Sequence, residues 1–192
     1  MTRLAIATSN AGKLREYGEL LAATGLELVA CESGVDENGA TYAENARLKA
    51  EAAVAKTGIW AIGDDSGLEV DALNGFPGLH SARLAPTQRE RTAELLRRLE
   101  GVPRPWPARF VCVIALAGPD GATTFHGGEA AGEIVPEWRG TAGFGYDPVF
   151  LVPEAGRTFG EMEPAEKHRW SHRAAAVRAL LASGELGAAA NP

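Results

Sequence analysis

Cysteine is scarce in this sequence, which has two, Cys31 and Cys112, among 192 residues. Two distant cysteines form neither a disulfide framework nor the paired spacing of a zinc site. The sequence also lacks a signal peptide and an apolar run long enough to span a membrane. We therefore expect a cytoplasmic protein with no membrane partner.

Basic residues are in the minority, with 19 Lys and Arg against 25 Asp and Glu and a net charge of -6. This balance argues against broad binding to nucleic acid or to anionic membranes, although it allows a local basic pocket. Internal repeats and low-complexity linkers are absent as well. The length fits one domain, residues 1–192, with or without a substantial second lobe, and needs no disulfide or metal for stability.

What the chain does contain is a pair of adjacent carboxylates, Asp64 and Asp65. The apolar residues 59–62 before them are typical of a buried strand, and Ser66 and Gly67 after them form turns readily. We therefore expect a strand that ends on the two acids. Such acids favour a cleft that holds a cation or a proton, but a solvated turn explains the pair alone equally well.

A second polar segment follows the predicted strand at residues 4–7. This segment opens a helix and consists of Thr8, Ser9, Asn10, Ala11, Gly12 and Lys13. Asn10 suits the N-cap, and free amides at a helix N-terminus beside a lysine attract phosphate. A capped helix with a surface lysine is the alternative, because the spacing of a P-loop is missing.

Thr41 and Glu44 have the spacing of a capping box at the start of a helix that Gly58 ends. The cap explains Glu44 completely. The functional alternative makes Glu44 a metal ligand at the start of the helix.

A glycine-rich loop at residues 139–148 contains Phe144, Gly145, Tyr146 and Asp147. Glycines beside Phe144 would let its ring lie against a planar ligand, as aromatic side chains do for bases. The commoner arrangement is a loop whose aromatic rings pack into the core.

Near the C-terminus, Lys167 precedes a predicted helix for which Ser171 is a natural N-cap. His172 and Arg173 then fall in the first turn, where cations oppose the helix dipole, so Arg173 indicates an anionic or polar ligand. His168 and His172 have the spacing of a zinc pair, but no third ligand lies nearby in the sequence.

The remaining apolar patterns predict one more helix and several strands. The helix opens with a capping box at Thr87 and ends before Gly101, and the strands cover residues 26–29, 110–117, 123–126, 130–135 and 149–152.

Four collinear segments together resemble the inosine triphosphate pyrophosphatase family, which hydrolyses non-standard purine nucleoside triphosphates. They are residues 8–13, 41–46, 64–78 and 143–148, the last followed by Lys167 and by Ser171, His172 and Arg173. Each motif is modest, but their order and spacing are specific and cover nearly the whole chain.

The resemblance implies an α/β fold in which helices flank a long, twisted mixed sheet and two lobes enclose a central nucleotide cleft. It implies a homodimer that needs Mg²⁺. The implied reaction converts ITP, dITP or XTP to the monophosphate and pyrophosphate, which removes these nucleotides from the pool.

The resemblance also assigns the site. Asp65 would be the general base and, with Glu44, a magnesium ligand; Ser66 would lie beside them. The loop from Thr8 to Lys13 would bind phosphate. Phe144 would stack on the base within the motif that continues through Gly145, Tyr146 and Asp147, and Lys167, His172 and Arg173 would contact phosphate and purine. Two departures from the family pattern are Ser9, where glycine is usual, and the bulky residues 168–170.

Donors aimed at a 6-keto purine would reject adenine, because the amino group of adenine leaves them unpaired. Two other functions remain open. A nucleotide-binding module without turnover would keep the loop and Phe144, and a metal-dependent phosphatase would release orthophosphate in place of pyrophosphate.

Overall fold

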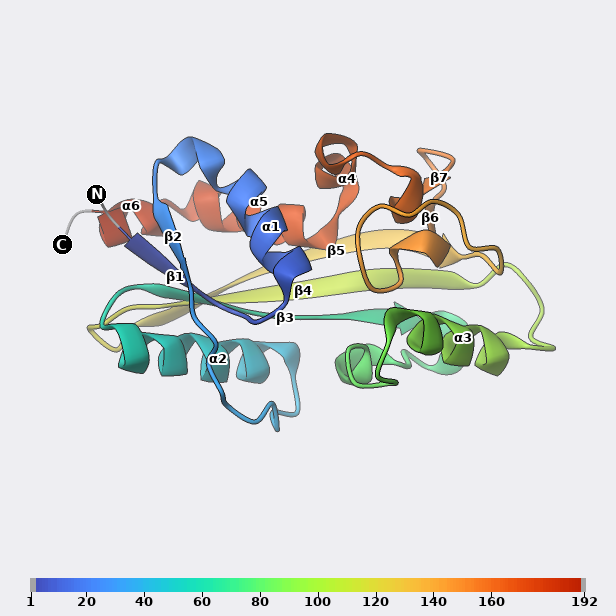
Figure 1. Ribbon diagram of the computed structural model, residues 1–192, viewed down its shortest axis with the longest axis horizontal. Coiled ribbons are helices and arrows are strands. Elements are labelled where there is room, and N and C mark those ends of the chain that lie inside the picture. The colour runs from blue at the N-terminus through green and yellow to red at the C-terminus, as the bar shows by residue number, and fades with distance from the viewer. Residues whose placement is uncertain (1–2, 191–192) are drawn as a thin grey trace. The chain divides into compact units, whose positions relative to one another are not determined.

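Seven strands form one sheet in the computed structural model, which describes residues 3–190, with side chains described up to Gly187. The strands are β1 Arg3–Ala7, β2 Glu27–Ala30, β3 Ala61–Val70, β4 Pro107–Ala117, β5 Thr123–Ile134, β6 Phe150–Val152 and β7 Arg157–Thr158. The α-helices are α1 Ala11–Leu20, α2 Tyr42–Thr57, α3 Gln88–Leu99, α4 Pro164–Trp170, α5 His172–Ser183 and α6 Glu185–Ala190 (Figure 1). Within residues 3–190, none of these helices has the length and apolarity that crossing a membrane requires.

The sheet is mixed, as the resemblance implies. Its strand order is β2-β1-β3-β4-β5-β6-β7, with β1 parallel to both β2 and β3, whereas β6 is antiparallel to β5 and β7. The chain therefore leaves β1 to one side for β2 and returns to the other side for β3. In open α/β sheets, the carboxyl end of a strand at such a reversal is where ligands usually bind.

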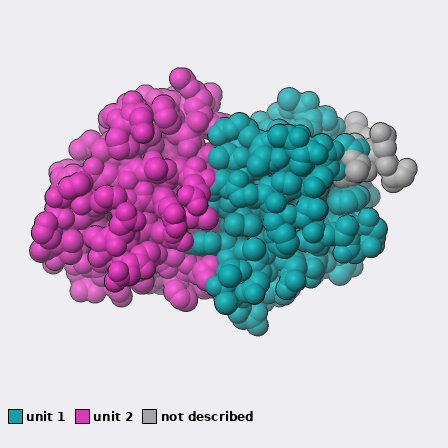
Figure 2. Space-filling view, turned by 180° about the vertical axis from the view of Figure 1, so that it is seen from behind, with its two compact units in different colours: residues 1–65, 112–128, 173–192 teal, residues 66–111, 129–172 magenta. Residues whose placement is uncertain are grey.

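The chain divides into two compact units, coloured separately in Figure 2. Unit 1 comprises residues 1–65, 112–128 and 173–192, and unit 2 comprises residues 66–111 and 129–172. Strands β3, β4 and β5 contribute residues to both units. The single-domain organisation and the nucleotide cleft between two lobes stay predictions.

In unit 1 the sheet has a helix layer on each face, with α2 on one and α1 and α5 on the other (Figure 1). Because side chains alternate along a strand, each face of the sheet in unit 1 has its own core. Leu4 and Ile6 of β1 pack with Tyr17 of α1 and Val177 of α5. The intervening alanines of β1 face the other way, where small side chains let α2 come close to the sheet.

Unit 2 has its own core, which is rich in aromatic side chains. Phe110 of β4 packs on Phe150 of β6, with ring centroids 4.6 Å apart. Leu95 and Leu99 of α3 belong to the same cluster. The helix that the capping box at Thr87 predicts is confirmed as α3, with both reciprocal hydrogen bonds of the box present.

One sequence prediction about local structure is wrong. The acids do not end a strand, because β3 runs on through Asp64, Asp65, Ser66 and Gly67 as far as Val70. Each acid finds cationic partners on its own face of the sheet, so the chain has no need to turn toward solvent at this point.

Candidate functional site

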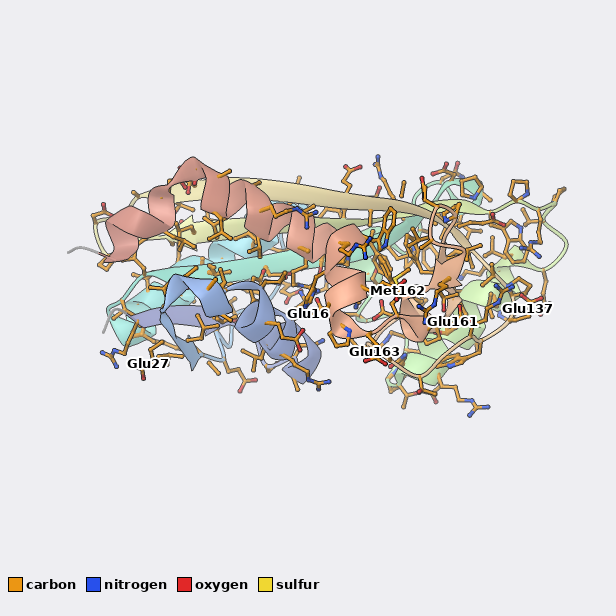
Figure 3. The ribbon with its side chains drawn as sticks, turned by 90° about the horizontal axis from the view of Figure 1, so that it is seen from above. Glu16, Glu27, Glu137, Glu161, Met162 and Glu163 are labelled. Carbon is orange, nitrogen blue, oxygen red and sulfur yellow. The ribbon has the colours of Figure 1, made fainter. Side chains whose placement is uncertain are left out.

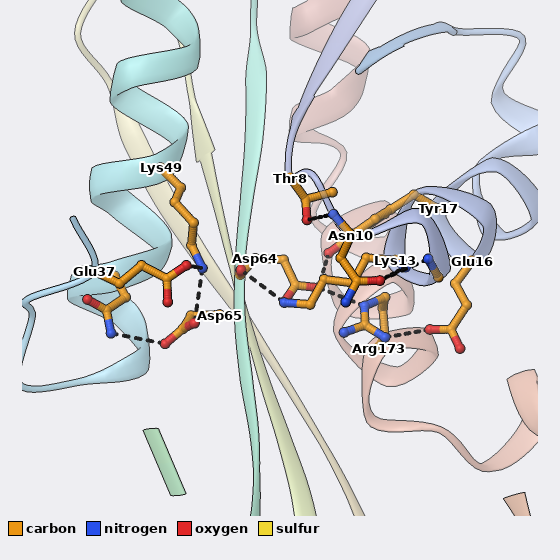
Figure 4. Close-up of polar contacts among 12 residues, drawn as sticks. Thr8, Asn10, Lys13, Glu16, Tyr17, Glu37, Lys49, Asp64, Asp65 and Arg173 are labelled. Atoms are coloured by element: carbon orange, nitrogen blue, oxygen red, sulfur yellow. Dashed lines mark hydrogen bonds and ion pairs between the residues drawn. The ribbon is translucent and has the colours of Figure 1, made fainter. Parts of the chain in front are cut away.

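Strand β3 presents its two carboxylates to opposite faces of unit 1. Ala7 of β1 is in register with Gly63, so Asp64 and Asp65 lie just past the carboxyl end of β1. Because side chains alternate along a strand, Asp64 shares a face with Ile62, and Asp65 shares the other face with Ala61. Figure 4 shows the resulting clusters on either side of the strand. The acids are therefore parts of two separate polar groups.

On the α2 face, Asp65 is held by two residues one helical turn apart. Asn45 donates its side-chain amide to Oδ2 at 3.1 Å, and the Lys49 ammonium lies 3.0 Å from Oδ1. The ammonium also lies 3.1 Å from Oε1 of Glu37, which belongs to the loop before α2. Both carboxylates thus converge on one cation.

Burial and charge act in opposite directions on this pair. Burial raises the pKa of Asp65 and outweighs the ammonium of Lys49, which lowers it. Burial lowers the pKa of Lys49, but the carboxylates of Asp65 and Glu37 raise it by more, so this pKa lies above its usual value. Lys49 has two acidic neighbours that together outweigh its burial, whereas the cation and the amide beside Asp65 do not outweigh the effect of burial on its pKa.

Gly63 allows α2 to sit this close. A Cβ atom at Gly63 would lie 2.0 Å from the backbone oxygen of Ala46 and 2.6 Å from the backbone nitrogen of Ala50. Only a residue without a side chain fits there, and the close packing brings Asn45 and Lys49 against Asp65.

Glu44 is the N3 residue of a complete capping box. Its Oε2 accepts the backbone N–H groups of Ala40 at 2.6 Å and of Thr41 at 3.1 Å, and the Thr41 hydroxyl accepts the Glu44 amide. The predicted capping role is therefore confirmed. A role for Glu44 in metal binding stays a prediction.

On the opposite face, the side chains of Lys13, Tyr17 and Arg173 bind Asp64. The Lys13 ammonium lies 2.6 Å from Oδ1, while Oδ2 accepts the Tyr17 hydroxyl at 2.9 Å and Nε of Arg173 at 2.7 Å. Burial alone would raise the pKa of Asp64. The charges of Arg173 and Lys13 more than reverse this effect and hold that pKa well below its usual value.

The predicted phosphate loop lies between β1 and α1. The Asn10 side-chain oxygen accepts the amides of Gly12 at 2.8 Å and Lys13 at 3.1 Å, which confirms Asn10 as the N-cap. The Thr8 hydroxyl accepts the Asn10 amide at 3.1 Å. Ser9 and Ala11 are exposed. Binding of phosphate by this loop stays a prediction.

In unit 2, the glycine-rich loop is organised by Asp147. Its Oδ2 accepts the Phe144 amide at 2.8 Å and lies 2.6 Å from the Lys167 ammonium. That ammonium lies 5.0 Å from the centre of the half-buried Phe144 ring. Gly143 and Gly145 have positive φ angles, which bend the loop around Phe144. The structure therefore brings Phe144, Asp147 and Lys167 together.

The other predicted site residues in unit 2 are more buried than is usual for residues of a ligand-binding loop. Tyr146 belongs to the core, its hydroxyl donates to the Ser81 carbonyl, and burial raises its pKa to about 12. His172 is buried, and its ring stacks on Phe110 with centroids 4.7 Å apart. Ser66 is half-buried in β3. Their contacts with substrate stay predictions.

The sequence patterns missed six residues of these clusters, which are Glu16, Tyr17, Glu37, Asn45, Lys49 and Asp64 as a member distinct from Asp65. Asn45 and Lys49 are four residues apart, which puts them on one face of α2, and that spacing was the available signal. Glu37 precedes the helix in irregular chain and had no such signal.

The fold and these clusters define an α/β protein. Its charged groups lie on both faces of β3, beside the carboxyl end of the neighbouring strand β1. The model of the Ham1 family matches residues 4–183, and the chain belongs to that family.

Comparison with known proteins gives similar relatives over nearly the full length. A protein of Gloeobacter violaceus named dITP/XTP pyrophosphatase is 50% identical over 97% of this chain and 96% of its own. A protein of the same name from a Nostoc species is 52% identical over 93% of this chain and 92% of its own. A solved structure of a HAM1 protein from Coxiella burnetii has a TM-score of 0.82 and 40% identity and covers 94% of this chain and 96% of its own. The expected α/β fold is thus confirmed.

Proposed function

We propose that this chain is a magnesium-dependent nucleoside triphosphate pyrophosphatase. It hydrolyses ITP, dITP and XTP to the monophosphate and pyrophosphate and so removes non-standard purines from the nucleotide pool. The names of the relatives support the reaction. The observation that carries the proposal is the buried carboxylate of Asp65, which Lys49 and Asn45 hold in a fixed orientation.

In this proposal Asp65 accepts the proton of the attacking water. A base works best when its pKa approaches the working pH, and burial shifts the pKa of Asp65 in that direction. Asn45 and Lys49 each donate to a different oxygen, so the carboxylate keeps one orientation. The ammonium of Lys49 also supplies positive charge where negative charge develops on the phosphate.

The residues present fit a magnesium ion. Within the described part of the chain, no group of three or more His, Cys, Asp and Glu residues is arranged to hold a metal. Magnesium commonly takes one or two protein carboxylates together with substrate phosphates, so two acids suffice. Asp65 and Glu37 both contact the Lys49 ammonium, so the two carboxylates lie within reach of one ion.

Asp65 and Glu37 would therefore hold the ion. Glu44, the second ligand that the resemblance implies, remains a weaker candidate because its Oε2 already binds two backbone amides. When bound, magnesium neutralises the charge of the leaving pyrophosphate.

Base recognition falls to unit 2 in this proposal. Phe144 offers a ring face for the purine, and stacking is worth about 1–3 kcal/mol for any base. Lys167 lies beside that ring and can donate to a 6-keto oxygen, a contact that adenine cannot accept. Phe144→Ala should therefore weaken all nucleotides alike.

The test is product analysis with a panel of nucleoside triphosphates. We expect pyrophosphate and monophosphate from dITP, ITP and XTP, little product from ATP, and loss of turnover when EDTA removes magnesium. Orthophosphate as the product would identify a phosphatase. Nucleotide binding without turnover would identify a binding module.

The homodimer that the resemblance implies and the cytoplasmic location that the sequence predicts are further parts of this proposal. Light scattering in solution tests the first, because a dimer has twice the mass of one chain.

A further inference from the structure

The Asp64 cluster, formed by Lys13, Glu16, Tyr17, Asp64 and Arg173 of unit 1, has no part in the chemistry assigned to Asp65. Within this cluster, Asp64 has the most hydrogen-bond partners (Figure 4). The Lys13 ammonium donates to the carboxylate at 2.6 Å and to the backbone oxygen of the same residue at 3.3 Å. Asp64 therefore holds Lys13 by two separate oxygens.

Asp64 is itself fixed from two helices. The Tyr17 hydroxyl comes from α1, and Arg173 comes from the first turn of α5. Arg173 also donates to Glu16 of α1, which is labelled in Figure 3. Arg173 is 1% exposed and Tyr17 is fully buried. A carboxylate with such partners has little freedom to reorient, so the position of Lys13 is fixed as well.

Lys13 is the member of the Asp64 cluster that a ligand can reach. Its side chain is 15% exposed, against 2% for that of Asp64. An ammonium has three N–H donors, and the two contacts with Asp64 use two of them. The third can meet an anion at the start of α1. A free lysine would lose much conformational freedom on binding such an anion, whereas a lysine already held in place loses little.

We propose that Asp64 is a positioning residue that holds the Lys13 ammonium ready for the polyphosphate of the substrate. This inference rests on the proposed function. A purely structural cluster, in which Asp64 only neutralises Arg173, is the alternative. The two differ in whether the effect of Asp64 on substrate depends on Lys13.

A double-mutant cycle separates them. The variants are Asp64→Asn, Lys13→Met and the double variant, and the readout is kcat/KM for pyrophosphate release from dITP. We expect Asp64→Asn to lower kcat/KM on the order of 10- to 100-fold, the range found when a metal-ligating side chain loses the partner that orients it. With Met at position 13 it should change kcat/KM by less than about twofold, which is within the error with which independent effects add. Equal losses in both backgrounds would overturn the proposal.

Glu16→Gln is the matched control. It removes the other acid beside Arg173 and leaves the contact between Lys13 and Asp64 in place. We expect it to lower the melting temperature and to change kcat/KM by the same factor in both Lys13 backgrounds. Coupling to Lys13 as strong as that of Asp64→Asn would mean that the whole cluster acts as a structural unit, and would overturn the proposal.

Two further measurements keep the test decisive. If Asp64→Asn does not fold, Tyr17→Phe replaces it, since this change removes one hydrogen bond to Asp64 and no charge. Its severalfold loss should vanish when Lys13 is Met, and a loss that persists contradicts the proposal. Calorimetric binding of inorganic tripolyphosphate to the same variants repeats the cycle without turnover. A wild-type protein that releases no pyrophosphate overturns the proposed function, whereas the tripolyphosphate cycle still decides the role of Asp64.

Discussion

Asp64 and Asp65 are neighbours on one strand, yet their surroundings in unit 1 differ in the balance between burial and charge. Asp64 faces α1 and α5, where a guanidinium, an ammonium and a phenol hydroxyl bind it. Asp65 faces α2, where one ammonium and one amide bind it, and Glu37 shares that ammonium. The pKa of Asp64 is lowered and that of Asp65 is raised.

This difference assigns opposite effects on stability to the two acids. Asp64, with a lowered pKa, stabilises the fold above its unfolded pKa of about 3.9, and this contribution is lost as pH falls through the folded value. Asp65, with a raised pKa, favours the fold only while it is protonated, and that contribution is lost as pH rises through the folded value. Near neutral pH, ionised Asp65 therefore costs stability, as reactive groups often do.

The largest expected effect is the loss of turnover on replacement of Asp65. Asp65→Asn should keep the fold and lower kcat for pyrophosphate release by about 10²–10⁴-fold, the usual contribution of general acid–base assistance. Asp71→Asn, which changes an exposed acid just after β3, is the matched control and should retain full activity. Near-normal turnover by a folded Asp65→Asn protein would contradict the assignment of the catalytic base to the Asp65 face of β3.

A smaller effect separates two glutamates on the Asp65 side. Glu37→Gln should lower kcat/KM by about 10- to 100-fold and raise the magnesium concentration needed for half-maximal rate. Glu44→Gln should leave both nearly unchanged, because glutamine also serves at the N3 position of a capping box. Magnesium titrations of the two variants decide the matter. The reverse pattern would make Glu44 the second ligand, as the family resemblance implies.

The smallest effect concerns the packing that brings α2 to Asp65. Gly63→Ala should lower the free energy of unfolding by about 1–3 kcal/mol, the cost of overpacking, because the new methyl group meets the backbone of α2. Gly18→Ala on α1 is the control: a Cβ atom there would have no neighbour within 4 Å, so this change should stabilise the protein by about 0.5–1 kcal/mol. Urea denaturation measures both. Equal effects at the two glycines would mean that α2 has room to move away from β3.

Local sequence patterns predicted those features that depend on neighbouring residues. The capping boxes at Thr41 and Thr87 and the N-cap at Asn10 are present as expected, because each is made within four residues of chain. The strands predicted at residues 123–126 and 130–135 are confirmed as parts of one strand, β5. The resemblance predicted the mixed sheet, which local patterns alone do not determine.

Partners distant in sequence were the features that local patterns missed. Lys49 is 16 residues from Asp65, and Arg173 is 109 residues from Asp64. Without those cations, two adjacent acids before Ser66 and Gly67 resemble a turn, which is why the predicted strand end was wrong. Nor does composition distinguish Lys49, which sits in an alanine-rich helix, from a lysine on a solvent-exposed face.

The most direct test of the division between the two acids is the free energy of unfolding at pH 7 for Asp64→Asn and Asp65→Asn, each compared with wild type by urea denaturation. Asp64→Asn should lose about 3–5 kcal/mol, because it breaks a buried ion pair and leaves Arg173 with less compensation. Asp65→Asn should be as stable as wild type or more stable. Equal losses in the two variants, or a larger loss in Asp65→Asn, would contradict the account.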